Sequence, residues 1–153
     1  MIRARITGTG GYAPERVVTN DELARKIDTT DEWITSRTGI RARHIARDDE
    51  QTSDMARAAA ERALAMAGIT AADLDLIVVG TISGDMPMPA CAAFLQHKLG
   101  ARCPSFDVSA ACAGSIYGLS IADKFIRTGA AKHVLVVGVE LLSRLLDWED
   151  RNT

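Results

Sequence analysis

The sequence lacks the features that mark secreted, membrane or zinc-binding proteins. Its 153 residues include three cysteines, Cys91, Cys103 and Cys112, and no CxxC pair, so neither a disulfide framework nor a cysteine-rich zinc site fits. Its apolar runs are far shorter than the ~20 residues that cross a bilayer. No apolar segment follows the charged N-terminus, as one would in a signal peptide. We therefore expect a cytoplasmic protein that does not bind membranes.

An excess of charge of either sign is also missing. Eighteen Lys and Arg face 20 Asp and Glu, for a formal net charge of −2, and nucleic-acid binding normally needs a basic surplus. The histidines, His44, His97 and His133, show neither HxxxH nor HExxH spacing. We expect no nucleic-acid partner and no metal, and we expect the histidines to be structural or solvated.

The residues that are present suit one globular domain. Hydrophobic residues make up 47% and charged residues 25%, which is typical of soluble proteins with a buried core. Alternating or wholly apolar segments predict strands, and capped segments that end at glycine predict helices. The predicted strands are 2–8, 75–80, 105–108 and 133–139, and the predicted helices are 21–27, 54–67, 89–99 and 111–128. This alternation predicts an α/β domain with a mainly parallel sheet.

A glycine-rich motif follows the first predicted strand. Gly8, Gly10 and Ala13 fit G-x-G-x-x-A, which is typical of dinucleotide-binding folds when a helix begins at once. Here Pro14 and two β-branched valines follow instead. We therefore favour a tight turn over a nucleotide site.

Cys112 stands where a predicted strand gives way to a helix. Ligands of parallel sheets bind beyond the carboxyl ends of the strands, and a helix N-terminus stabilises a thiolate and a developing oxyanion. Small neighbours leave space for a substrate. Cys112 is thus either a nucleophile or one more small buried residue. Cys91 and Cys103 lack this setting, and we expect both to be packing residues.

Several motifs together resemble the N-terminal half of β-ketoacyl-acyl-carrier-protein synthase III, a condensing enzyme that starts bacterial fatty acid synthesis. They are spread along all 153 residues. They are Gly8-Thr9-Gly10 with Tyr12 and Pro14, the segments 30–34 (TDEWI) and 37–40 (RTGI), the segment 107–114 (DVSAACAG), and 150–153 (DRNT).

The resemblance implies a thiolase-like α/β fold. Residues 1–153 would form one βαβαβαββ half, with a mainly parallel sheet, a cap insertion at about 29–50, and the last strand missing from this chain. Two such halves stack in five layers, αβαβα, and the family works as a homodimer, which we expect to join near strand 105–108. We expect the natural chain to continue past Thr153 into the absent C-terminal half.

The resemblance also implies the chemistry. Cys112 would accept an acyl group from acyl-CoA, and malonyl-acyl carrier protein would then decarboxylate and attack the thioester. Trp33 and Arg151 match positions that sandwich the adenine of CoA, and Arg37 and Thr29 match further CoA contacts. Aromatic rings and guanidinium groups stack on purines, and arginine donates to phosphate. Acyl-CoA is then a substrate, and no cofactor is expected.

Two departures from the family pattern leave the chain length of the acyl primer undetermined. Met88 matches a family position, usually phenylalanine, that reaches the partner's acyl pocket, and Ser115 stands where an aromatic residue is common. The family's catalytic His and Asn lie in the half that this chain lacks. The alternatives are a non-catalytic binding or scaffold domain, or a specialised acyltransferase of secondary metabolism.

Overall fold

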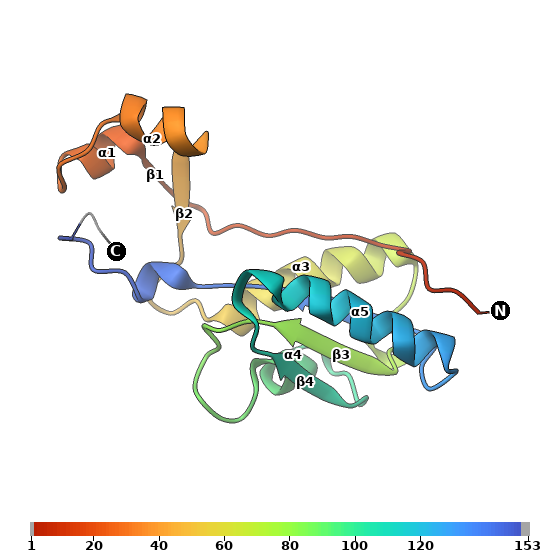
Figure 1. The fold of residues 1–153 in the computed structure, drawn as a ribbon. Helices are drawn as coiled ribbons and strands as arrows, with labels where there is room; N and C mark the ends of the chain where they lie inside the picture. The colour runs from red at the N-terminus through yellow and green to blue at the C-terminus, as the bar shows by residue number, and fades with distance from the viewer. Residues whose placement is uncertain (1, 151–153) are drawn as a thin grey trace. The chain divides into compact units, whose positions relative to one another are not determined.

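The computed structural model describes residues 2–150, which divide into two units (Figure 1). The described part of the first unit consists of residues 2–12 and 51–140. That of the second consists of residues 13–50 and 141–150.

A three-stranded parallel sheet forms the centre of the first unit. β3 (Leu76–Gly80) lies between β4 (Ser105–Val108) and β5 (Val134–Gly138), with Val78 opposite Phe106 and Val136. All five residues of β3 are buried, as expected of an apolar strand covered on both faces. The predicted parallel sheet and its last three strands are confirmed.

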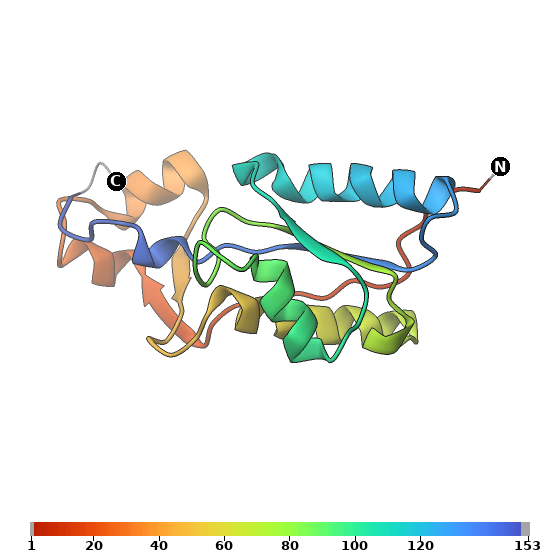
Figure 2. The same ribbon diagram turned by 90° about the horizontal axis from the view of Figure 1, so that it is seen from below.

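Helices cover both faces of this sheet (Figure 2). α3 (Thr52–Ala67) and α4 (Cys91–Leu99) pack on one face, and α5 (Gly114–Arg127) packs on the other. A short 3₁₀ turn, η1 (Ala71–Asp73), precedes β3. α3 and α4 end at glycines in the left-handed conformation, as the sequence predicted.

The alternation of side chains along β3 builds the two sides of the core. Ile77 and Val79, both fully buried, join the cluster that includes Ala56 of α3 and Leu95 of α4. Val78 faces the opposite way, towards α5. Because successive side chains of a strand point to opposite faces, β3 contributes to the core on both sides of the sheet.

The N-terminal segment is where the sequence prediction is wrong. Residues 2–8 form no strand with any residue that the structure describes; part of this segment and β5 instead line a cavity of about 440 Å³, and no backbone pairing is described between them. Gly8 and Gly10 instead pack on α3, where an added Cβ would lie 2.2 Å from the carbonyl oxygen of Ala63 and 2.1 Å from that of Ala59. The motif therefore serves close packing, and neither a tight turn nor a nucleotide-binding helix start is present.

The second unit contains the helix predicted at 21–27, now seen as α1 (Asn20–Ala24), together with elements that the sequence pattern did not predict. β1 (Arg16–Thr19) pairs with β2 (Ala42–Ile45) in antiparallel fashion. The helices are α1 and α2 (Asp31–Thr38), and a 3₁₀ turn, η3 (Leu142–Arg144), follows much later in the chain. Thr19 caps α1 in a capping box. The expected insertion at 29–50 falls within this unit.

Asn20 holds the second unit together through its side-chain amide. It is 1% exposed, and its Nδ2 donates to Asp31 Oδ1 at 2.7 Å and to the carbonyl oxygen of Ile40 at 2.8 Å. Its Oδ1 accepts from Nη1 of Arg43 at 2.7 Å. One buried side chain thereby connects α1, α2 and β2.

Arg144 joins the two sequence segments of the same unit. Its Nη2 donates to the carbonyl oxygens of Arg47, Asp48 and Glu50, at 2.9, 3.0 and 2.7 Å. These contacts attach residues 141–150 to the loop after β2. In the part of the chain described, no helix has the length and apolar character needed to cross a membrane.

We predict that Asn20→Ala lowers the free energy of unfolding by about 2–3 kcal/mol, because it leaves buried donors and acceptors without partners. Urea unfolding measures the change. Lys26→Ala, an exposed residue near the end of α1, is the control and should stay within about 0.5 kcal/mol of the parent. Equal effects of the two substitutions would contradict the role of Asn20.

Candidate functional site

Cys112 lies at the carboxyl edge of the sheet, where the sequence predicted it. It belongs to a 3₁₀ turn, η2 (Ala111–Ala113), between β4 and α5, and it is exposed. The preceding Ala111 has a φ of 44°, in the left-handed region that residues other than glycine rarely adopt. Such strain often accompanies functional turns that present a side chain. The alternative of a small buried cysteine is wrong.

Glycines set the position of this turn. An added Cβ on Gly80, at the end of β3, would lie 2.6 Å from the carbonyl carbon of Gly114, the first residue of α5. One on Gly138, at the end of β5, would lie 2.9 Å from Cβ of Ser115. The first turn of α5 can therefore lie directly against the ends of two strands. The sequence signal was a glycine at the end of each apolar strand, and the sequence reasoning gave it no role.

The other two cysteines are packing residues, as expected. Cys91 is 1% exposed, and burial, with the carboxylates of Asp85 and Asp107 nearby, raises the pKa of its thiol to about 12. Burial also raises the pKa of Cys103. Neither thiol has the exposed setting of Cys112.

Asp107 has a structural role that the sequence reasoning missed. Its carboxylate accepts from the backbone amides of Cys91 at 2.7 Å and Ala92 at 2.8 Å, which begin α4. α4 has no side-chain cap of its own, so a residue of β4 supplies one. The strand that leads to Cys112 is thereby tied to the helix beside it.

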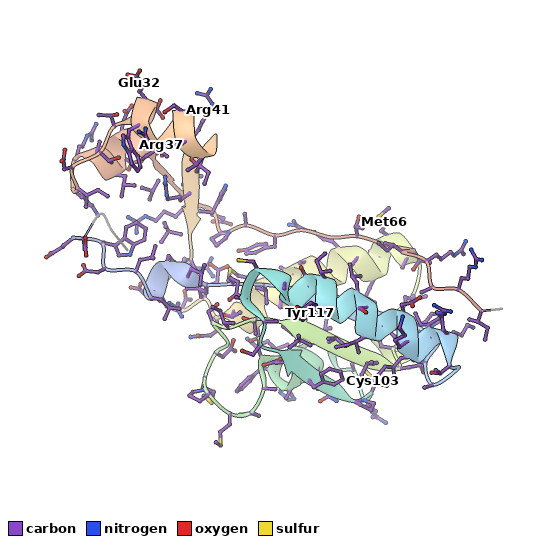
Figure 3. All side chains as sticks on the ribbon, viewed as in Figure 1. Glu32, Arg37, Arg41, Met66, Cys103 and Tyr117 are labelled. Atoms are coloured by element: carbon purple, nitrogen blue, oxygen red, sulfur yellow. The ribbon has the colours of Figure 1, made fainter. Side chains whose placement is uncertain are left out.

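The predicted CoA-binding residues that the structure describes all lie in the second unit. Thr30 caps α2 by accepting from the amide of Trp33 at 3.0 Å, which fixes the first turn of the helix. Trp33 is 43% exposed, and the guanidinium of Arg37, which is labelled in Figure 3, lies 4.5 Å from the centre of the Trp33 ring, one helical turn away. This is a cation–π pair on an accessible surface. Arg151 lies outside the described residues.

A pocket of about 140 Å³ adjoins Trp33 within the same unit. Thr29 and Trp33 line it together with Asp147 and Trp148, which come from the far end of the chain. The indole Nε1 of Trp148 donates to the carbonyl oxygen of Ser143 at 2.9 Å, which orients the ring. Sequence reasoning missed Trp148, although it stands three residues before Arg151.

The histidines show no arrangement for nucleophilic catalysis. Nδ1 of His44 lies 2.5 Å from the carbonyl oxygen of Pro14, and Nδ1 of His133 lies 3.1 Å from that of Asp73. His97 belongs to the last turn of α4. The contacts of His44 and His133 agree with the expected structural role.

Comparison with known proteins identifies relatives of this arrangement. A family model described as 3-oxoacyl-[acyl-carrier-protein (ACP)] synthase III matches residues 106–153, which include Cys112. A β-ketoacyl-[acyl-carrier-protein] synthase III of Xanthomonas campestris pv. campestris is 56% identical over 153 residues, covering 99% of this chain and 47% of that protein. The chain spans about half the length of the curated relatives it matches.

Solved structures agree with the sequence comparison. The crystal structure of 3-oxoacyl-[acyl-carrier-protein] synthase III from Aquifex aeolicus has a TM-score of 0.94 at 47% identity, over 100% of this chain and 49% of that one. The priming β-ketosynthase of the R1128 polyketide biosynthetic pathway has a TM-score of 0.93 at 44% identity, over 98% and 46%. The predicted thiolase-like fold class is confirmed.

We predict that iodoacetamide alkylates Cys112 first in the folded protein near neutral pH. Cys91 and Cys103 are buried, and Cys91 stays a neutral thiol even at pH 9 because its pKa is near 12. Peptide mass spectrometry over time measures the order of labelling. In urea all three thiols should react, and faster labelling of Cys91 or Cys103 in folded protein would refute the assignment.

Proposed function

Because the chain matches the N-terminal half of β-ketoacyl-[acyl-carrier-protein] synthase III along its whole length, we propose that it contributes to decarboxylative condensation. The substrates are an acyl-CoA primer and malonyl-acyl carrier protein, and the reaction is that which initiates fatty acid synthesis. The observation that carries the proposal is exposed Cys112 on a strained turn at the carboxyl edge of the sheet.

The first half-reaction is transfer of the acyl group to Cys112. The Sγ thiolate attacks the thioester carbonyl of acyl-CoA, a carbon–sulfur bond forms, and the CoA thiolate leaves as the tetrahedral intermediate collapses. Backbone amides near the start of α5 are candidates to donate to the oxyanion. Alanines and glycine around the thiol leave room for the acyl chain.

The second half-reaction needs groups beyond these residues. Malonyl-acyl carrier protein loses CO₂, its enolate carbon attacks the acyl-Cys112 carbonyl, and the Cys112 thiolate is released as the β-ketoacyl product forms. By resemblance, a His and an Asn of a second half stabilise the enolate. Four large apolar residues on α5 are exposed enough to suit a surface covered by that half: Ile116, Tyr117, Leu119 and Phe125.

The second unit supplies the expected CoA-binding surface. The exposed Trp33 ring offers a stacking face for adenine, Arg37 offers donors to phosphate, and Thr29 lines the adjoining pocket. Arg151 would stack on the other side of the purine. The thiol and the substrates carry the chemistry, so no separate cofactor is needed, and we place the reaction in the cytoplasm, where acyl-CoA is found.

One alternative has an observation in its favour. The structural similarity to a priming ketosynthase of a polyketide pathway, with Met88 and Ser115 in place of aromatic residues, suits a specialised acyltransferase of secondary metabolism. Both alternatives use Cys112 in the same way, and they differ in the primer. A non-catalytic scaffold would need neither an exposed thiol nor the CoA-binding residues.

We predict that the full-length enzyme gains the mass of one acyl group when it is incubated with acyl-CoA, and that peptide mapping places the group on Cys112. Intact-protein mass spectrometry across primers of different length measures it. Cys112→Ser is the control and should gain no such mass. The proposal would be refuted if the Cys112→Ser variant gained the acyl mass, or if no primer acylated the parent enzyme.

The 153-residue chain alone serves as a second comparison. We expect slow acylation at best and no β-ketoacyl product, since a lost oxyanion donor costs about 10²–10³ in rate. Malonyl-dependent CO₂ release by this chain, abolished by Cys112→Ser, would mean that the condensing groups lie within it.

We further predict a homodimer joined through the outer edge of β4. Among the described residues, β4 pairs only with β3, and its unpaired edge favours pairing with a twofold mate. The carbonyl of Pro104 accepts from the amide of Ile77 in β3, and that of Val108 accepts from the amide of Thr81, which follows β3, so by strand alternation the amide of Ser105 faces outward. Ser105→Pro in the full-length enzyme should therefore sediment as a monomer with near-native circular dichroism. A monomeric parent at micromolar concentration would contradict this.

A further inference from the structure

The loop between β3 and α4 has two parts: its first residues, the loop base, are fixed by hydrogen bonds, and its tip is exposed and apolar. Residues 81–90 form a wide arc away from the sheet (Figure 1), and the tip Met86-Pro87-Met88-Pro89 is exposed, Met88 to 79%. The two methionines alternate with prolines, and Met86 is exposed as well, to 51%. The base, by contrast, begins at Thr81, which is 4% exposed.

Glu140, two residues after β5, holds the first part of this loop. Its carboxylate accepts from the backbone amide of Ile82 at 3.1 Å, from the hydroxyl of Thr81 at 3.2 Å, and from the hydroxyl of Ser83. Three successive residues thus donate to one carboxylate. A charged acceptor makes each of these hydrogen bonds stronger than a neutral one would.

The loop is held again just before its tip. The carbonyl oxygen of Ser83 accepts from the hydroxyl of Thr52 at 2.5 Å. The carboxylate of Asp85 accepts from the amide and the hydroxyl of Ser53, at 2.8 and 2.5 Å, and so caps the start of α3. Both partners on α3 are buried, Thr52 to 2% and Ser53 to 0% exposure. The tip therefore extends from a base that cannot shift without breaking several hydrogen bonds.

We propose that Glu140 is a positioning residue that sets how far Met88 extends, and through Met88 the length of acyl chain that the enzyme accepts. This inference rests on the proposed function and on the resemblance, in which Met88 matches a position that reaches the acyl pocket of the partner subunit. Glu140 itself touches no substrate. Its effect passes through the three donors of the loop base.

A purely stabilising role makes a different prediction. If Glu140 only stabilised the fold, its loss would lower the rate with every primer by the same factor. If it sets the reach of Met88, its loss changes the ratio of rates between long and short primers. The ratio therefore separates the two roles, whatever happens to overall activity.

The test uses the full-length enzyme and its acylation by acetyl-, butyryl-, hexanoyl- and octanoyl-CoA. In Glu140→Gln the amide nitrogen cannot accept, so the loop base loses part of its hold. We expect the octanoyl-to-acetyl ratio of kcat/KM to change at least about fivefold, since one methylene in a fitted pocket is worth about 10-fold or more. Glu61→Gln, an exposed carboxylate on α3, is the matched control and should leave the ratio unchanged.

A double substitution tests whether the effect passes through Met88. Met88→Ala should change the ratio by itself, and adding Glu140→Gln should then change it little further, because coupled residues are not additive. Glu140→Asp, which keeps the charge but is shorter by one methylene, gives the same comparison if Glu140→Gln does not fold. An unchanged ratio in a variant that acylates refutes the inference alone. If none of the primers acylates the parent enzyme, the proposed function is refuted and this inference with it.

Discussion

The close approach of α5 to the ends of β3 and β5 determines where the candidate nucleophile lies. Gly80 and Gly114 approach so closely that a single added Cβ would meet backbone at 2.6 Å. Backbone has little room to give, so the helix start and the strand ends are fixed relative to one another. Cys112 stands two residues before α5, so its position is fixed along with the start of that helix. The positive φ of Ala111 is tolerated because the fixed elements on either side hold the turn in this conformation.

Away from these glycines, carboxylate side chains fix the positions of the loops and helix starts. Asp107 caps α4, Asp85 caps α3, and Glu140 accepts from the loop after β3. In each case a side chain satisfies backbone or hydroxyl donors that no helix or sheet partner could reach. A carboxylate from one element is therefore bonded to the beginning of another, and the loops of the first unit are held by contacts distant in sequence.

Sequence reasoning succeeded where periodicity is local and failed where partners are distant. The apolar runs of β3 and β5 and the glycine stops of α3 and α4 identify themselves, because strand and helix periods act over a few residues. Residues 2–8 alternate like a strand, yet a strand also needs a neighbour, and none exists within the described residues. Cys112 was found from its place between strand and helix. Trp148 and Glu140 were missed because their roles depend on contacts with residues far away in the sequence.

The second unit is assembled from two segments of sequence separated by the whole sheet of the first. During synthesis Trp33 and Asn20 leave the ribosome long before Arg144 and Trp148 exist. Until Arg144 has been synthesised, the carbonyl groups of residues 47–50 have only water as a hydrogen-bond partner in place of its guanidinium. Since domains tend to fold from the N-terminus as they are made, the nascent chain should complete its parallel sheet first. The surface expected to bind CoA would then mature later than the turn that carries the thiol.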